Sequence, residues 1–293
     1  WVQNGRDNIE TSVISNFIWH NGNLLNEDEG LSFNRRSHLY GDGLFETLRI
    51  HKGKICFWES HYFRLMSSMR ILRMDIPLDW SPDKLASEIL TFKPESSTSD
   101  YRVRLSIWRA GELGYKPTTN SIDWCMHITG INGFGYPNPV RLQKLALFQE
   151  HKKSKGLLST LKMSQSALYI LTANFAQEQN VDDAVLLSHD NHVLETSRGN
   201  IFILKEGSLV TPSLEDGALR GVMREQVLKL SKNIGLIATE KKISPFDLLK
   251  ADEIWITNAI QGIMAVSEYR KSTYVSVLAN KMQDEVNKKC LEF

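Results

Sequence analysis

The stretch VLETSRGNIFIL, residues 193–204, has the pattern of two strand segments with little room for a turn between them. Val193 and Leu194 lead into it, and the apolar run 201–204 ends it. Runs of this kind are typical of buried strands. Glu195 lies between them, and a carboxylate seldom stays buried without a partner. Two interpretations follow: an edge strand with Glu195 in solvent, or a buried Glu195 that pairs with a cation.

The composition is that of a soluble globular protein with room for two domains. The chain has 293 residues, of which 42% are hydrophobic and 24% charged. Its 35 Lys and Arg nearly balance its 34 Asp and Glu, so we expect neither nucleic acid nor a membrane as partner. The apolar runs are too short to span a bilayer. Cys56, Cys125 and Cys290 are odd in number and far apart, which favours a reduced cytoplasmic setting without a disulfide framework or structural zinc.

Hairpin and helix signals alternate along the chain. Asn21-Gly22 predicts a hairpin over 17–25, and Lys52-Gly53 predicts another over 44–58, because each pair lies between apolar flanks. Apolar spacing and capping residues predict helices at 59–74, from Ser81-Pro82 onward, at about 164–180, at about 222–233 and at the C-terminus.

Strands and helices mix throughout, so the fold class is α/β or α+β. Glycines, prolines and asparagines cluster at 130–140, which predicts an interdomain linker. The predicted domains are therefore 1–129 and 141–293. The histidines show no metal-ligand spacing, so we predict no metal.

Four separated segments carry residues whose chemistry fits together. Arg64 shares a helix face with His61, and Lys162 lies between a strand and a helix. Each has a plain alternative, a solvated basic face for the first and a surface lysine for the second. The segment GALRGVMREQVLKL (217–230) leads from a glycine-containing loop into a helix start, which favours a phosphate. Together these features predict a pyridoxal phosphate site. Such a site needs a helix start for the phosphate, an arginine, a lysine that can attack a carbonyl and a buried carboxylate.

The ordered sum of these motifs resembles the class IV aminotransferase family, the fold-type IV pyridoxal phosphate enzymes. This family includes branched-chain aminotransferases, D-amino acid aminotransferases and 4-amino-4-deoxychorismate lyases. The resemblance covers almost the whole chain. It rests on YGDGLFETLRI, HYFRL, the LK before the helix, VLETSRGNIFIL, LRGVMR and ITNAIQGI, which occur in family order at family-like spacing.

The resemblance implies a role for each matching residue. Lys162 matches the catalytic lysine that carries the cofactor and shuttles the proton, and Glu195 matches the carboxylate on the ring nitrogen. Arg64 matches the phosphate-binding arginine. Two loops match the phosphate-binding backbone, at Val222 and Met223 and at Asn258 and Ala259. Met223 stands where many members have threonine, which suggests a weaker hold on the phosphate.

The resemblance also implies an architecture. We expect a smaller N-terminal α/β domain, a larger C-terminal domain with a barrel-like sheet, and a homodimer. The substrate would be an amino acid or aminodeoxychorismate.

The residues that would face the substrate leave the reaction open. Arg104 matches an arginine near the substrate carboxylate in branched-chain aminotransferases, with a surface arginine as the alternative. Arg109 resembles the start of a substrate loop in lyases and D-amino acid enzymes, but Gly114 replaces the second arginine of that loop. Phe45 would line the pocket, although strand aromatics usually belong to the core.

The pair Asn258-Ala259 favours the lyase, which releases 4-aminobenzoate and pyruvate. A branched-chain-like aminotransferase with a 2-oxo acid acceptor is the alternative. A D-amino acid aminotransferase and a non-catalytic homologue that binds the cofactor are further possibilities. Tyr40 and Tyr169 could reach the cofactor, or could be core aromatics with a hydrogen-bonded hydroxyl.

Overall fold

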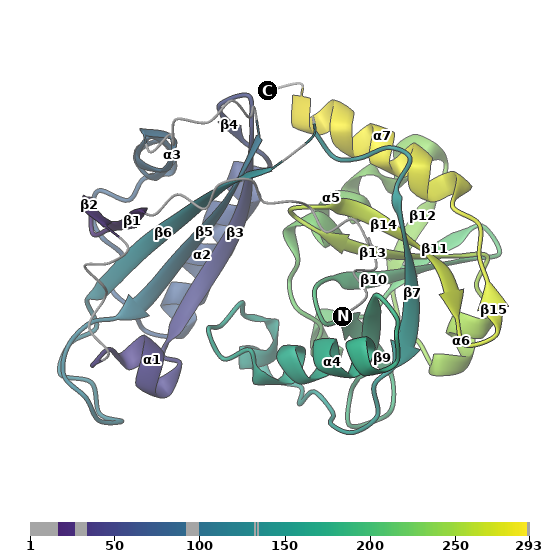
Figure 1. The fold of residues 1–293 in the computed structure, drawn as a ribbon, viewed down its shortest axis with the longest axis horizontal. Coiled ribbons are helices and arrows are strands. Elements are labelled where there is room, and N and C mark those ends of the chain that lie inside the picture. The colour runs from purple at the N-terminus through teal and green to yellow at the C-terminus, as the bar shows by residue number, and fades with distance from the viewer. Residues whose placement is uncertain (1–16, 27–33, 92–99, 132, 134, 292–293) are drawn as a thin grey trace, which may run out of the picture. The chain divides into compact units, whose positions relative to one another are not determined.

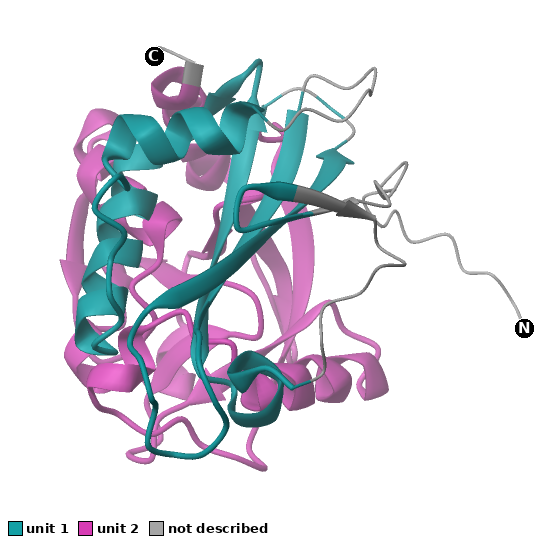
Figure 2. Cartoon of the chain, turned by 90° about the vertical axis from the view of Figure 1, so that its left-hand side faces the viewer, with its two compact units in different colours: residues 1–135 teal, residues 136–293 magenta. Residues whose placement is uncertain are grey.

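The chain divides into two compact units (Figures 1 and 2). The computed structural model describes residues 17–26, 34–91, 100–131, 133 and 135–291. Unit 1 is Trp1–Gly135 and unit 2 is Tyr136–Phe293. The boundary between the units therefore lies within the segment rich in glycine, proline and asparagine.

Unit 1 contains a six-stranded antiparallel sheet in the order β2-β1-β6-β5-β3-β4. Its centre is formed by β3 (Gly43–His51), β5 (Asp100–Arg109) and β6 (Ile122–Ile131), which pair along almost their whole lengths. The outer strands are β1 (Phe17–His20), β2 (Asn23–Asn26) and β4 (Lys54–Ile55).

Both predicted hairpins of unit 1 are confirmed. The β1–β2 turn has Asn21 at φ 47° and Gly22 at φ 83°, and the β3–β4 turn has Lys52 at φ 47° and Gly53 at φ 79°. Two successive residues with positive φ give a tight turn whose twist matches that of the flanking strands. The turn chemistry in the sequence therefore sets the register of both hairpins.

The described residues of unit 1 contain the helices α1 (Arg36–Tyr40), α2 (Trp58–Ile71) and α3 (Pro82–Thr91). The central helix α2 packs against β3 and buries Leu65, Met66 and Met69. The predicted cap of α3 is present, since the Lys84 amide donates to Ser81 Oγ at 3.2 Å.

Six strands of unit 2 close into a ring (Figure 1). Neighbours pair in the order β10-β13-β14-β7-β8-β9, and β9 returns to β10 through Glu195 and Asn200. This closure confirms the predicted barrel-like sheet. The ring strands are β7 (Arg141–Leu147), β8 (Asp183–Leu187), β9 (Val193–Thr196), β10 (Asn200–Lys205), β13 (Glu253–Asn258) and β14 (Gly262–Tyr269). Outside the ring lie β11 (Ser208–Thr211), β12 (Ile237–Glu240) and β15 (Ser272–Thr273).

Alternate residues of the ring strands form one apolar cluster, which includes Leu145, Val185, Ile201, Ile256 and Met264. The other residues of β8 pack against α4 (Ala167–Glu178), through Ala184 and Leu186. Because both faces of β8 are covered, all its residues are buried. The remaining helices are α5 (Val222–Leu230), α6 (Pro245–Leu249) and α7 (Val277–Leu291), with 3-10 turns η2 (Leu157–Thr160), η3 (Leu214–Asp216) and η4 (Ser231–Ile234).

The cysteines differ from the prediction. Cys125 is a buried free thiol, but Cys56 and Cys290 are disulfide-bonded, so the expected absence of disulfides is wrong. Among the described residues, no helix is both long and apolar enough to cross a membrane. The same residues contain no group of three or more His, Cys, Asp or Glu that could hold a metal ion.

Glu253 anchors α7 to the ring. Its carboxylate is buried and accepts from the Leu278 amide at 2.8 Å, the Ala279 amide at 2.9 Å and Trp255 Nε1 at 2.8 Å. We expect Glu253→Gln to lower the free energy of unfolding by about 1–3 kcal/mol, because an amide NH₂ group would face buried donors. Urea denaturation measures the loss. Glu268→Gln removes a half-exposed ion pair and should cost less than about 1 kcal/mol; an equal loss in both variants would contradict the anchoring role.

Candidate cofactor site

Glu195 is a buried carboxylate at the closing pair of the ring. It is 2% exposed and pairs with Leu186 of β8 and Asn200 of β10. Its Oε1 accepts from Lys153 Nζ at 2.5 Å and from the Tyr169 hydroxyl at 2.8 Å. Its Oε2 accepts from the Leu219 amide at 2.8 Å and, at 3.5 Å, from Asn200 Nδ2. The interpretation of a buried Glu195 with a cationic partner agrees with this geometry, and that partner is a lysine of the chain itself.

Lys153 is a site residue that the sequence did not reveal. Its side chain is 8% exposed, and Nζ also donates to the Ser159 carbonyl at 2.9 Å. The backbone of Lys153 runs beside the end of β8, where its amide donates to the Leu187 carbonyl at 2.9 Å. In the sequence it belongs to the run HKKSK, which is typical of a solvated segment.

Tyr169 reaches Glu195 from the first turns of α4. Burial, followed by the charge of Glu195, raises the pKa of the phenol. Tyr169 therefore stays protonated at neutral pH and donates to the carboxylate. Its ring lies 5.5 Å from Lys153 Nζ, within the range of a cation–π contact. Of the two tyrosines considered from the sequence, Tyr169 belongs to this site, whereas Tyr40 accepts from the Gly114 amide in unit 1.

Lys162 lies between η2 and α4 and is partly buried. Two contacts tie the segment just before it to the Glu195 site. The Ser159 carbonyl accepts from Lys153, and the Thr160 carbonyl accepts from the Arg220 amide at 3.2 Å. Arg220 directly follows Leu219, whose amide donates to Glu195. The chain that carries Lys162 is thus held by the same groups that hold the carboxylate.

The start of α5 has no side-chain cap. Gly221 is its N-cap and no side chain caps it, so the first backbone N–H groups, at Val222 and Met223, face no capping acceptor. A Cβ on Gly221 would lie 1.8 Å from Asn200 Oδ1, so any other residue there would have to displace the Asn200 side chain. A helix start without a side-chain cap, a buried carboxylate and an adjacent lysine-bearing segment fit pyridoxal phosphate.

Asn258 and Ala259 lie in the β13–β14 turn. Asn258 Oδ1 accepts from the Ile260 amide at 3.0 Å and the Gln261 amide at 2.8 Å. The Ala259 carbonyl accepts from the Tyr136 hydroxyl at 3.0 Å. These contacts fix the shape of the turn, and the role of the pair in phosphate binding stays a prediction.

Arg64 of unit 1 forms a bidentate pair with Glu46 of β3. Its Nε donates to Oε1 at 2.7 Å and its Nη2 to Oε2 at 2.5 Å, while His61 Nδ1 lies 2.7 Å from Oε2. Although burial opposes ionisation, Arg64 and His61 lower the pKa of Glu46 to about 2. Sequence reasoning paired Arg64 only with a phosphate, and that role stays a prediction.

Phe45 and Arg104 lie together in unit 1. The guanidinium of Arg104 stacks 3.8 Å from the centroid of the Phe45 ring. Burial, and then the charge of Arg102, lowers the pKa of Arg104. A partly buried cation on an aromatic ring attracts a carboxylate that also carries apolar groups.

Arg109 has a different environment. Its Nε donates to Asp42 at 3.1 Å, Nη1 donates to Asn120 at 2.6 Å, and Nη2 donates to the Leu72 carbonyl at 2.7 Å. It is 8% exposed, so its guanidinium holds three segments of unit 1 together. Because these contacts occupy its guanidinium, Arg109 has a structural role in unit 1, and its contact with a substrate stays a prediction.

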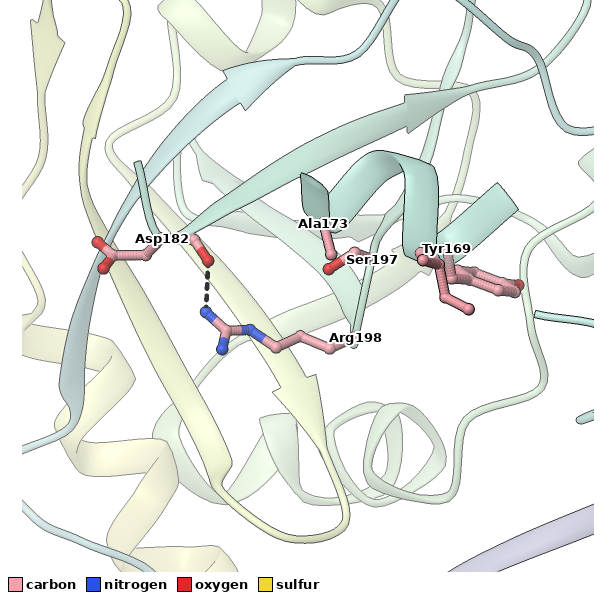
Figure 3. A pocket seen from close by; sticks show the side chains of 6 residues that line it. Tyr169, Ala173, Asp182, Ser197 and Arg198 are labelled. Carbon is pink, nitrogen blue, oxygen red and sulfur yellow. Dashed lines mark hydrogen bonds between the residues drawn. The ribbon is translucent and has the colours of Figure 1, made fainter. Parts of the chain in front are cut away.

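A surface pocket of unit 2 borders the site at Tyr169 (Figure 3). Tyr169 and Ala173 line it from α4, and Asp182, Ser197 and Arg198 line it from two connections of the ring. Arg198 Nη2 donates to the Asp182 carbonyl at 2.7 Å, so the Arg198 guanidinium is bonded to another residue that lines the pocket. Figure 3 shows this bond as a dashed line.

Comparison with known proteins agrees with the geometry. The family profile "Amino-transferase class IV" matches residues 43–269. The chain is 32% identical over 285 residues, 94% of each chain, to "Putative branched-chain-amino-acid aminotransferase" of Methanocaldococcus jannaschii. It is 28% identical to the aminodeoxychorismate lyase of Vibrio harveyi, over 86% of this chain and 94% of the relative. The branched-chain aminotransferase of Thermoproteus uzoniensis has a similar fold, with a TM-score of 0.83, 23% identity and 93% of each chain covered.

The Glu46 pair makes the stability of the protein depend on acidity. The depressed pKa of Glu46 contributes stability that is fully present above its ordinary pKa of 4.5 and is lost as the pH falls toward about 2. We expect the stability advantage of the wild type over Glu46→Gln to shrink by up to about 3 kcal/mol across this interval. Denaturation at a series of pH values measures it. Glu59→Gln, on the exposed side of α2, should keep the wild-type profile; an unchanged gap for Glu46→Gln would refute the assignment.

The close approach at Gly221 gives a second prediction for this site. We expect Gly221→Ala to destabilise the fold by about 1–3 kcal/mol and to weaken cofactor binding, because its Cβ would displace Asn200. Thermal unfolding and cofactor titration measure both effects. In an Asn200→Ala background the clash is removed, so Gly221→Ala should cost clearly less there. Equal costs in the two backgrounds would show that the contact is unimportant.

Proposed function

Because the chain belongs to the class IV aminotransferase family, whose members are pyridoxal phosphate-dependent enzymes, we propose that it is an amino acid aminotransferase of the branched-chain-like type. Its acceptor is a 2-oxo acid. The observation that carries the proposal is the 32% identity, over 94% of each chain, to the Methanocaldococcus jannaschii relative. The sequence motifs alone favoured the lyase, and this similarity reverses that order.

The cofactor supplies an electron sink for the bond that breaks at the substrate Cα. Lys162 is the residue that binds the cofactor and moves the Cα proton. Glu195 provides the negative charge for the ring nitrogen, and the start of α5, at Val222 and Met223, receives the phosphate. The contacts of the Lys162 segment with Glu195 through Lys153 and Leu219 support this assignment.

The substrate side of the proposal rests on unit 1. Phe45 provides an apolar surface for an aliphatic side chain, and Arg104 provides a cation for a carboxylate. Phosphate binding by Arg64, Asn258 and Ala259, assembly as a homodimer and a cytoplasmic location remain predictions.

The second candidate is the lyase reaction on aminodeoxychorismate. The relative in Vibrio harveyi, covered over 94% of its length, is named for this activity. The pair Asn258-Ala259 in the β13–β14 turn also resembles lyase-like members. The lyase needs no amino acceptor, so one assay separates the two reactions.

We expect the protein loaded with pyridoxal phosphate to transfer the amino group of L-leucine to 2-oxoglutarate. Lys162→Ala should abolish turnover and the visible absorption of the lysine-bound cofactor while the far-UV circular dichroism stays unchanged. Lys155→Ala, an exposed lysine of the same segment, is the control and should retain full activity. Release of 4-aminobenzoate from aminodeoxychorismate without transfer from L-leucine would establish the lyase. D-alanine as the only active donor would establish a D-amino acid aminotransferase.

A further inference from the structure

Lys153 contacts the carboxylate that the cofactor ring would need. The pair is almost fully buried, with side-chain exposures of 8% for Lys153 and 2% for Glu195. A buried carboxylate without a cation takes up a proton, because burial disfavours its charged form. Lys153 therefore provides the positive charge that pairs with Glu195 before any ring is bound.

The two oxygens of Glu195 are occupied unequally. Each carboxylate oxygen can accept about two hydrogen bonds. Oε1 has two short ones, from Lys153 at 2.5 Å and Tyr169 at 2.8 Å. Oε2 has one short bond, from the Leu219 amide at 2.8 Å, and a contact with Asn200 at 3.5 Å, which is at the limit of a hydrogen bond.

Asn200 has a better partner elsewhere. Its Nδ2 donates to the Leu219 carbonyl at 2.9 Å, so the contact with Glu195 can be given up at little cost. The acceptor position that remains for an incoming cationic N–H group is therefore on Oε2. Oε1 stays bound to the lysine and the phenol.

We propose that Lys153 is a positioning residue for Glu195: it keeps the carboxylate ionised, binds its Oε1, and leaves Oε2 to receive the protonated ring nitrogen of the cofactor. The inference rests on the cofactor and not on which reaction follows. Lys153 itself touches neither substrate nor the reacting atoms. In the part of the chain that the structure describes, Glu195 accepts hydrogen bonds from two ionisable side chains, Lys153 and Tyr169, and from amide groups of β10 and of the loop before α5.

Replacement of Lys153 gives a signature in the pH dependence of cofactor binding. In Lys153→Met the buried Glu195 binds a proton, and a cofactor with a protonated ring must displace it. One proton then leaves on binding, so the ratio of the variant's cofactor Kd to the wild-type Kd should fall with rising pH, by up to about tenfold per unit. A merely structural role would change this ratio equally at every pH.

The experiment titrates the apoprotein with pyridoxal phosphate at a series of pH values around neutrality. Visible absorption and protein fluorescence both follow binding. Lys153→Arg should restore the wild-type profile, and Lys155→Met, an exposed lysine two residues away, should never depart from it. A constant Kd ratio for Lys153→Met, or wild-type affinity at every pH, would overturn the proposal.

If Lys153→Met binds too little cofactor for the titration, a double-mutant cycle on the apoprotein tests the same ion pair. Lys153→Met and Glu195→Gln each remove one partner of a buried ion pair, whereas the double variant removes both partners together. The double variant should therefore lose less stability in denaturant than the sum of the two single variants. Additive losses would contradict the pairing. Because both experiments measure apoprotein stability or cofactor binding, their failure is distinguishable from failure to transaminate.

Discussion

The closure of the strand ring in unit 2 depends on a buried carboxylate. Glu195 pairs with Asn200 at the point where β9 returns to β10, and the charge buried there requires donors. Those donors come from Lys153, Tyr169 and Leu219, which belong to three different segments. The need to satisfy one carboxylate thus brings together the connection before α4, the first turns of α4 and the loop before α5. The pair that closes the ring and the candidate site therefore share one residue, Glu195.

Local chemistry could be predicted from the sequence where it acts over short distances. The hairpins at Asn21-Gly22 and Lys52-Gly53 follow from backbone preferences of neighbouring residues. Glu195 and its apolar neighbours also lie in one short stretch of sequence. A buried carboxylate at this position could therefore be predicted as one of two alternatives. The identity of its partner could not be predicted, because Lys153 is 42 residues away and lies in a lysine-rich run typical of a surface.

Arg109 also shows that the sequence does not reveal which distant groups a side chain contacts. Sequence reasoning assigned Arg109 to a substrate, yet its donors are used by Asp42, Asn120 and Leu72. A guanidinium carries five donors, and nothing local determines whether a ligand or the protein satisfies them.

Two of the buried glutamates, Glu46 and Glu195, show how environment separates a structural carboxylate from a functional one. Glu46 is held by a bidentate arginine and a histidine, and both of these side chains come from α2. Glu195 is held by a flexible lysine, a neutral phenol, one amide and a long contact from Asn200. In the first arrangement, both carboxylate oxygens of Glu46 already accept hydrogen bonds from these two side chains. The second retains an acceptor position that a cationic ring can fill, which is the property that a cofactor site requires and that burial alone does not provide.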